Sequence, residues 1–421
     1  MRYLQEFSRK FAYINWAIAD QVMVSGTNFA TTVLVARFLG IEEFGRFALA
    51  WLAVFFAQNV QIALVISPMM TIGAKQSTDD HASYSGAVVV QQFLFAIITT
   101  GIVIAGITVA DMARSDWGLG QVMVPLATLV FIGQLTEFLR RYYFTFNKAR
   151  ISFLVDAVRY GSQLLMLCAL FLVVGTSLNI SKVFQILAAS AFLGLCAGAF
   201  CFGPFRLDWM SIRRVAERHW RFSRWIMPSA IATWCRENFI HTAVAAVLGL
   251  TELGALRAAQ QLVHMVNILI QSFDNIVPMR AGRAYSGHGF AGLVDFIDGF
   301  VLRYSAAIAC LLLAIGLFGE QLMLLVYGPG YDAYGSFVAA YAAVMVLYLV
   351  RNLLAIMVRA METTVFEFYS SILGAVFITV CSAPLVSNVG MAGAFIAMAV
   401  FESIMIFSLS FSLQSKRILS M

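Results

Sequence analysis

The sequence predicts an all-α integral membrane protein of about twelve transmembrane helices, arranged as two six-helix lobes. Three observations predict it: the composition is strongly apolar, long apolar runs recur along the chain, and the second half repeats turns of the first. Of the 421 residues, 61% are hydrophobic and only 12% are charged, and the mean hydropathy is +0.83. Such a chain has too little polar surface to cover a water-soluble globule of its size.

Runs of about 20 largely apolar residues are long enough to span the hydrocarbon core of a bilayer. There are twelve, at 13–37, 45–71, 86–110, 119–143, 151–174, 183–203, 225–248, 254–278, 297–318, 333–356, 364–386 and 390–413. A β-barrel is excluded because its strands would alternate in polarity over about 10 residues. The first run is long, polar on one side and without a small-residue cleavage site, so we expect a helix there and no signal peptide.

Two short motifs occur twice in the chain. The Leu-Gly-x-x-x-x-Gly turn at 39–45 recurs at 248–254, and Pro68-Met69 recurs as Pro278-Met279, each after one long apolar helix. An internal repeat in an apolar protein predicts a transporter whose site lies between the halves. Because each half has an even number of helices, we expect a pseudo-two-fold axis along the membrane normal and a central cavity.

We expect an N-terminal lobe at 1–203, a cytoplasmic basic amphipathic linker at 204–224 and a C-terminal lobe at 225–421. Most of the 28 Lys and Arg residues fall in alternate loops, which places those loops and both termini in the cytoplasm. The net charge of +6 is therefore a topology signal, and we expect no nucleic-acid partner. The linker interleaves arginines with aromatic residues, which favours a helix in the headgroup layer over an ordinary basic loop.

Motifs for covalent chemistry or cofactors are missing from the sequence. The cysteines lie within predicted spans without paired spacing, which indicates packing residues instead of disulfides or metal ligands: Cys168, Cys196, Cys201, Cys235, Cys310 and Cys381. No loop suits ATP, and no segment outside the membrane is long enough for a catalytic domain. We therefore expect no enzyme, no catalytic residues, no cofactor and no metal.

Polar residues follow one face of the run at 254–278. They recur every three or four positions, which aligns them along a helix: Arg257, Gln260, Gln261, His264, Asn267, Gln271 and Asp274. Ionisable side chains inside the bilayer usually face the bundle interior or a watery cavity. This stripe carries charges of both signs and predicts a cavity wall.

Two other helices carry similar stripes. The run at 225–248 contains Arg236, Glu237 and His241, and the run at 13–37 carries Asp20 beside a milder stripe of Gln21, Ser25, Asn28 and Thr32. The second helix adds Gln58, Asn59 and Gln61 to the expected wall. The alternative is that these polar groups hydrogen-bond neighbouring helices together.

The charges of this wall suggest its cargo. Arg236 and Arg257 are permanently charged forks suited to phosphate, although Glu237 could instead neutralise Arg236. The predicted substrate-binding residues are Arg236, Arg257, His241, His264, Gln260, Gln261, Asn267, Gln271 and Asn28. The candidates for ion coupling are Asp20, Glu237, Asp274 and Glu402.

Several further charges have other predicted roles. Glu402 is central in the last helix and has no evident partner, so we expect it to be either a proton carrier or a neutral buried acid. Arg351 is expected to extend to the cytoplasmic surface. Glu137, Asp156 and Arg159 lie near Arg140, Arg141 and Arg150, and we expect local ion pairs between the acids and the arginines of this group.

Two turn motifs resemble a known family. Val35–Phe47, which contains Arg37-Phe38-Leu39-Gly40 and Glu42-Glu43-Phe44-Gly45, and Leu325–Tyr331, which reads Leu-Val-Tyr-Gly-Pro-Gly-Tyr, are similar to those of bacterial polysaccharide transporters. These are the Wzx-type flippases for O-antigen and exopolysaccharide, a branch of the multidrug/oligosaccharidyl-lipid/polysaccharide exporter superfamily. The resemblance covers essentially the whole chain, and the chain lacks the two extra helices of the related lipid II flippases.

The resemblance implies alternating access and a lipid-linked oligosaccharide as substrate. An undecaprenyl-pyrophosphate carrier would move from the cytoplasmic to the periplasmic leaflet of the inner membrane, with Arg236 and Arg257 neutralising the pyrophosphate and Gln and Asn residues binding sugar hydroxyls. Membrane lipids are the other expected partners. Proton or sodium coupling and contact with polysaccharide polymerase machinery are further hypotheses.

Three alternatives compete with this interpretation. An ion-coupled multidrug or cation antiporter of the same superfamily would favour an acidic, aromatic cavity. A membrane-embedded polysaccharide polymerase would need a larger outer loop than those near 111–118 and 319–332. A scramblase or scaffold would not need paired halves and a lined cavity.

Overall fold

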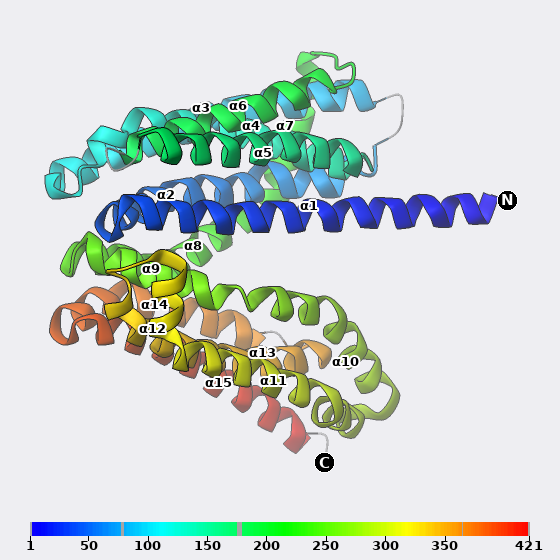
Figure 1. Ribbon diagram of the computed structural model, residues 1–421. Helices are drawn as coiled ribbons and strands as arrows, with labels where there is room; N and C mark the ends of the chain where they lie inside the picture. The colour runs from blue at the N-terminus through cyan, green and yellow to red at the C-terminus, as the bar shows by residue number, and fades with distance from the viewer. Residues whose placement is uncertain (1, 77–79, 175–178, 364, 420–421) are drawn as a thin grey trace. The chain divides into compact units, whose positions relative to one another are not determined.

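The computed structural model describes residues 2–76, 80–174, 179–363 and 365–419, and all regular structure in these ranges is helical (Figure 1). The chain divides into two compact units, residues 1–234 (unit 1) and 235–421 (unit 2). The prediction of an all-helical membrane protein is confirmed for the described residues.

Unit 1 is a bundle of long helices. Its elements are α1 (Arg2–Leu39), α2 (Ile41–Gln61) with the π-helical turns η1 (Ile62–Ile66) and η2 (Met69–Gly73), α3 (His81–Ala113), the 3₁₀ turns η3 (Ser115–Trp117) and η4 (Leu119–Val122), α4 (Met123–Thr145), α5 (Ala149–Val174), α6 (Ile180–Phe200) and α7 (Trp209–Ser223). Helix α5 packs against α1 and α6, and α4 packs against α3 and α6. Helix α8 (Ile226–Val247) begins in unit 1 and ends in unit 2.

Unit 2 has α13 at its centre. Its elements are α9 (Leu250–His264), α10 (Asn267–Phe296), η5 (Ile297–Val301), α11 (Leu302–Leu317), α12 (Gly319–Tyr327), η6 (Asp332–Tyr334), α13 (Gly335–Ala360), α14 (Val365–Val389) and α15 (Met391–Leu419). Helix α13 packs against α9, α10, α11 and α15, and α14 packs against α15. Helix α10 bends at His288 and Gly289, whose backbone angles are not helical.

Ten helical segments in the described residues are long and apolar enough to cross a membrane, compared with the twelve predicted. The two predicted spans outside this set, 225–248 and 254–278, are the ones that carry the strongest polar stripes. Helix α8 holds Arg236 and Glu237 at its midpoint and His241 beyond it, and α9 is only 15 residues long. Both segments are helical, but the charged residues at the centre of α8 and the break after His264 that ends α9 set them apart from the other spans.

The repeated turn has the same backbone conformation in both units. Gly40 precedes α2 with φ 81°, and Gly249 precedes α9 with φ 106°. These angles lie in a region that residues with a Cβ rarely adopt, so the turn requires glycine. The carbonyl of each glycine accepts a hydrogen bond from the amide four residues later, of Phe44 and of Leu253.

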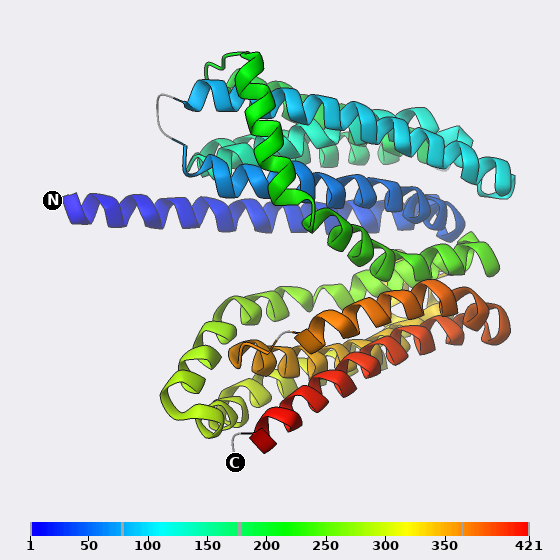
Figure 2. The same ribbon diagram turned by 180° about the vertical axis from the view of Figure 1, so that it is seen from behind.

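Helix α7 lies across unit 1 and is fastened to α3 (Figure 2). Its buried edge consists of Val215, His219 and Ser223, and His219 Nε2 lies 3.1 Å from the hydroxyl of Tyr84 on α3. The segment before α7 also contacts α3, because the amide of Arg206 donates to the carbonyl of Ala82 over 2.9 Å. The linker is therefore a packed part of unit 1.

Gly86 allows this close approach, since a Cβ there would lie 2.1 Å from the carbonyl oxygen of Arg206. We expect Gly86→Ala to lower the free energy of unfolding by about 1–3 kcal/mol, because the segment before α7 must shift. Thermal unfolding of the purified protein measures the change. Gly101→Ala is the matched control on the same helix, where a new Cβ meets nothing within 4 Å. Equal effects of the two substitutions would contradict the role of Gly86.

His219 makes stability depend on pH. Burial, and then the nearby charge of Arg218, lower the pKa of His219 from 6.5 to about 4. Its Nδ1 is buried without a hydrogen-bond partner among the described residues, so a second proton there would be costly.

The unfolded chain therefore binds a proton near pH 6.5, whereas the folded protein binds it only near pH 4. The free energy of unfolding that depends on His219 is therefore highest above pH 6.5 and falls as the pH falls, by about 2 kcal/mol between pH 7.5 and pH 5. Between pH 7.5 and pH 5, the thermal unfolding midpoint should fall less in His219→Gln than in the native protein. An unchanged pH dependence in His219→Gln would exclude this histidine as the cause.

Candidate functional site

The polar faces of α8 and α9 meet at one side chain in unit 2. His241 Nε2 on α8 lies 2.8 Å from Oε1 of Gln260 on α9, and Arg257 Nη1 donates to the same oxygen over 3.5 Å. Arginine can only donate, so it requires the amide oxygen of Gln260 on its side. His241 Nε2 is consequently the donor in its own bond, and we call these three residues the Gln260 junction.

Two further predicted residues lie on the same helical run. His264 Nε2 lies 2.8 Å from the hydroxyl of Tyr341 on α13, and the two rings are tilted edge to face. Gln261 is half-buried on α9, as is Asn267 at the start of α10. The structure thus brings Arg257, Gln260 and His241 together, with His264 one turn further along α9.

The predicted stripe at 254–278 is not one continuous helix. Helix α9 ends at His264 and α10 begins at Asn267, with a turn at Met265 and Val266. The side chains of Gln271 and Asp274 lie outside the described residues.

Arg236 has a mixed environment. Its Nη2 lies 3.0 Å from the carboxylate of Glu237, and its guanidinium lies 5.6 Å from the ring centroid of Phe401 on α15. A neighbouring carboxylate of this kind reduces the charge that Arg236 presents to an anion. Arg257 Nη1 donates to a neutral amide, and Arg257 is the other candidate for phosphate binding.

Glu402 has a partner in the structure, contrary to the sequence prediction. Its carboxylate lies 2.6 Å from Nε of Arg351 on α13. Arg351 also lies 4.6 Å from the ring centroid of Tyr348 on its own helix. Through Glu402 the guanidinium therefore meets α15 instead of extending to the surface. The two residues lie far apart in the sequence, which is why inspection of the last helix alone did not reveal the pair.

In unit 1, the predicted stripe on α1 lies on an exposed face. Asn28 and Gln21 are exposed, Gln21 bonds Ser25, and Thr32 donates to the carbonyl of Asn28. These hydrogen bonds stay within α1, so they do not hold it to its neighbours in unit 1. Asp20 points the other way and is only 1% exposed.

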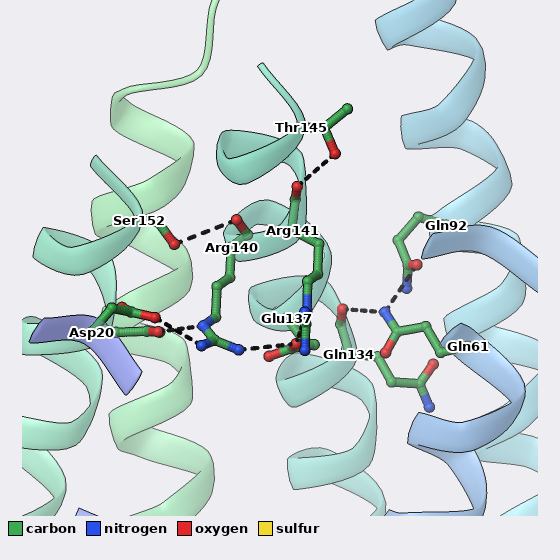
Figure 3. Close-up of polar contacts among 10 residues, drawn as sticks. Asp20, Gln61, Gln92, Gln134, Glu137, Arg140, Arg141, Thr145 and Ser152 are labelled. Atoms are coloured by element: carbon green, nitrogen blue, oxygen red, sulfur yellow. Dashed lines mark hydrogen bonds and ion pairs between the residues drawn. The ribbon is translucent and has the colours of Figure 1, made fainter. Parts of the chain in front are cut away.

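Asp20 belongs to a buried ionic cluster centred on Arg140 (Figure 3). Arg140 on α4 contacts Asp20 on α1 at 2.7 Å, Asp156 on α5 at 2.6 Å and Glu137 at 3.3 Å. Arg141 also binds Glu137, at 2.7 Å. The ion pairing predicted for Glu137 and Asp156 is confirmed, and the participation of Asp20 is new.

A second buried network joins α2, α3 and α4. Gln61 donates to Oε1 of Gln92 over 3.0 Å and to the carbonyl of Gln134 over 2.7 Å (Figure 3). Thr99 donates to Oε1 of Gln134. Gln61 is fully buried within unit 1, so its predicted place on a cavity wall is wrong. The few polar residues of α2 do not mark one face of the helix clearly, so the sequence pattern does not show which face Gln61 occupies.

The sequence matches a family described as "Polysaccharide biosynthesis protein" over residues 34–279. No curated protein sequence matches the chain significantly. The match spans more than half of the chain, including the repeated turns at Gly40 and Gly249 and the Gln260 junction.

Solved structures share the fold at low sequence identity. A multidrug resistance MATE family transporter of the MOP superfamily, in an inward-facing conformation, has a TM-score of 0.72 and 14% identity over 95% of both chains. The lipid II flippase MurJ, in an inward closed conformation, has a TM-score of 0.64 and 11% identity over 95% of this chain and 87% of its own.

A third structure is a MOP superfamily transporter from Pyrococcus furiosus, described as having a binding pocket of reverse polarity. It has a TM-score of 0.53 and 14% identity, over 99% of this chain and 94% of its own. At these identities the likenesses show the fold alone, and they show it over nearly the full length.

The Arg140 cluster generates a stability prediction. Arg140→Met would leave Asp20 and Asp156 buried without their cation, so we expect the free energy of unfolding to fall by about 3–5 kcal/mol. Arg141→Met is the matched control, because Arg141 is 35% exposed and its loss should cost at most about 1 kcal/mol. Thermal unfolding in detergent measures both.

Adding Asp20→Asn and Asp156→Asn to Arg140→Met removes the stranded charges and should restore much of the loss. If Arg140→Met and Arg141→Met destabilise equally, the cluster does not have the central role assigned to it.

Proposed function

Because the chain belongs to the polysaccharide biosynthesis protein family, we propose that it is a flippase for a lipid-linked oligosaccharide used to build a cell-surface polysaccharide. The substrate would be an oligosaccharide on undecaprenyl pyrophosphate, moved from the cytoplasmic to the periplasmic leaflet of the bacterial inner membrane. The proposal includes twelve spans in two lobes, 1–203 and 225–421, joined by the linker at 204–224, with both termini cytoplasmic. The shared fold of MOP superfamily transporters supports alternating access.

The observation that carries this proposal is the Gln260 junction. Two adjacent helices, both interrupted by polar residues within an apolar chain, direct an arginine and a histidine to one neutral amide oxygen. Hydrogen bonds between ionised donors and phosphate are among the stronger ones in proteins. Arg257 is such a donor and therefore supports recognition of a pyrophosphate, with the Nε2–H group of His241 beside it.

Other predicted residues supply weaker contacts in the proposal. Gln261 and Asn267 are half-buried polar groups suited to sugar hydroxyls, and Asn28 is exposed on α1. Arg236 assists with the part of its positive charge that Glu237 does not neutralise. The inside-negative membrane potential favours outward movement of an anion by about 2.3 kcal/mol per charge per 100 mV.

The ion-coupled antiporter is the second candidate, and the fold of the multidrug transporter supports it equally well. A cationic cargo would need acidic side chains available to it. Asp20, Glu237 and Glu402 each lie within 4.0 Å of an arginine in the structure. This pairing favours an anionic cargo, and ion coupling through these residues stays a prediction.

We expect Arg257→Ala to lower the rate of flipping about tenfold or more, because one charge-assisted hydrogen bond to the substrate is lost. A strain that lacks the gene should accumulate cytoplasm-facing lipid-linked oligosaccharide in extracted membrane lipids. The native gene should clear it, and Arg257→Ala should not. Arg257→Lys should restore part of the activity because it keeps the charge.

Arg283→Ala is the matched control, since Arg283 is exposed in the same unit. It should clear the intermediate as the native protein does, at equal protein levels. Absence of accumulation in the deletion strain would reject the flippase and favour the antiporter. Accumulation in the deletion strain but not in Arg257→Ala would keep the flippase and reject the assigned phosphate role.

A further inference from the structure

Helix α7 presents an aromatic flank next to its buried edge. Trp209 and Trp220 are 76% and 55% exposed, and helical periodicity places them on the same side, beside Ala216. Arg213 and Arg224 follow along that side, about a turn from the tryptophans. A helix with one edge packed on protein and an exposed tryptophan flank has the composition of an interfacial helix.

The position of α7 along α3 gives its depth. Tyr84, which contacts His219, lies three residues after the start of α3 at His81. Gly86, which contacts the backbone of Arg206, lies five residues after it. These residues are about 5–8 Å along the helix from its start, at 1.5 Å per residue. Helix α3 has 33 residues, which makes it about 50 Å long, whereas the hydrocarbon core is about 30 Å thick.

The first turn of α3 is polar, with His81, Ser83 and Ser85, and the apolar run of this helix begins only at Gly86. This places the first turn of α3 beyond the hydrocarbon core, in the headgroup layer. Helix α7 packs against this end of α3 and crosses the long helices of unit 1 (Figure 2). A helix that crosses the spans at this point runs along the membrane plane at headgroup level. Interfacial helices insert to a comparable depth of about 5–10 Å. The geometry thus places the tryptophan flank where aromatic side chains are enriched in membrane proteins.

The charge of this segment is strongly positive. Residues 204–225 contain six arginines and two acids. Both acids are engaged locally: Asp208 accepts from the amide of Ser211 over 2.9 Å, and Glu217 lies 3.2 Å from Arg213 and 3.9 Å from Arg221. Basic residues at the membrane surface attract anionic lipids.

We propose that α7 is a binding site for anionic phospholipid, with Trp209 and Trp220 inserted among the headgroups and Arg213 and Arg224 on the lipid phosphates. The arginines on the opposite side, Arg214, Arg218 and Arg221, add to the positive field. Because the buried edge of α7 is fastened to α3, lipid bound here is held against unit 1. This site is separate from the Gln260 junction, and it does not depend on the proposed function.

The test uses the full-length protein in phosphatidylcholine vesicles with increasing phosphatidylglycerol. One of the two lipids carries bromine in its acyl chains near the headgroup, which quenches nearby tryptophans. Trp209→Phe/Trp220→Phe identifies the share of the emission that comes from α7. We expect that share to be quenched at a lower fraction of brominated phosphatidylglycerol than of brominated phosphatidylcholine, and the difference to shrink in high salt.

Arg213→Gln/Arg224→Gln should reduce this preference roughly tenfold or more. Arg213→Lys/Arg224→Lys is the matched control and should keep it. None of these substitutions touches the buried edge of α7, and an unchanged unfolding midpoint checks that the helix stays packed.

Three results would overturn the proposal. Quenching that is unchanged in Trp209→Phe/Trp220→Phe would show that the flank does not reach lipid. Equal quenching by both lipids would remove the anionic specificity and favour a protein partner for the arginines. A preference that survives Arg213→Gln/Arg224→Gln would assign it to other residues.

Discussion

The buried guanidinium of Arg140 is the constraint on which unit 1 depends. A charge inside a membrane bundle cannot be solvated by water, so it must meet its partners in one arrangement of the helices. Arg140 on α4 reaches Asp20 on α1 and Asp156 on α5 at once, and both aspartates are essentially inaccessible. Sliding or rotating any of these three helices would separate Arg140 from these aspartates.

A related solution occurs in unit 2. Arg351 on α13 meets Glu402 on α15, and α13 is also the helix around which the unit packs. Each unit therefore uses an arginine from a central helix to hold an acid from another helix. The repeated turn before α2 and α9, with glycine at positive φ, shows the same kinship at the level of the backbone.

This use of charge distinguishes scaffold from candidate site. Arg140 and Arg351 contact carboxylates directly, which suits them to holding helices together. In the Gln260 junction an arginine and a histidine instead meet a neutral amide, and the proposed phosphate role rests on this difference. The polar residues of α8 and α9 set these helices apart from the ten helical segments that are clearly apolar enough to cross a membrane.

The amino-acid sequence by itself determined the helical membrane class, the repeated turn and the polar stripe on α9, because these follow from composition, glycine conformation and helical periodicity. Periodicity places a residue on a face of its own helix, but it does not say which helix that face meets. Only the tertiary structure decided that Asp20 turns to Arg140, that Glu402 meets Arg351 and that Gln61 is buried. Each of these contacts joins residues of different helices, so the partner is set by packing and not by local pattern.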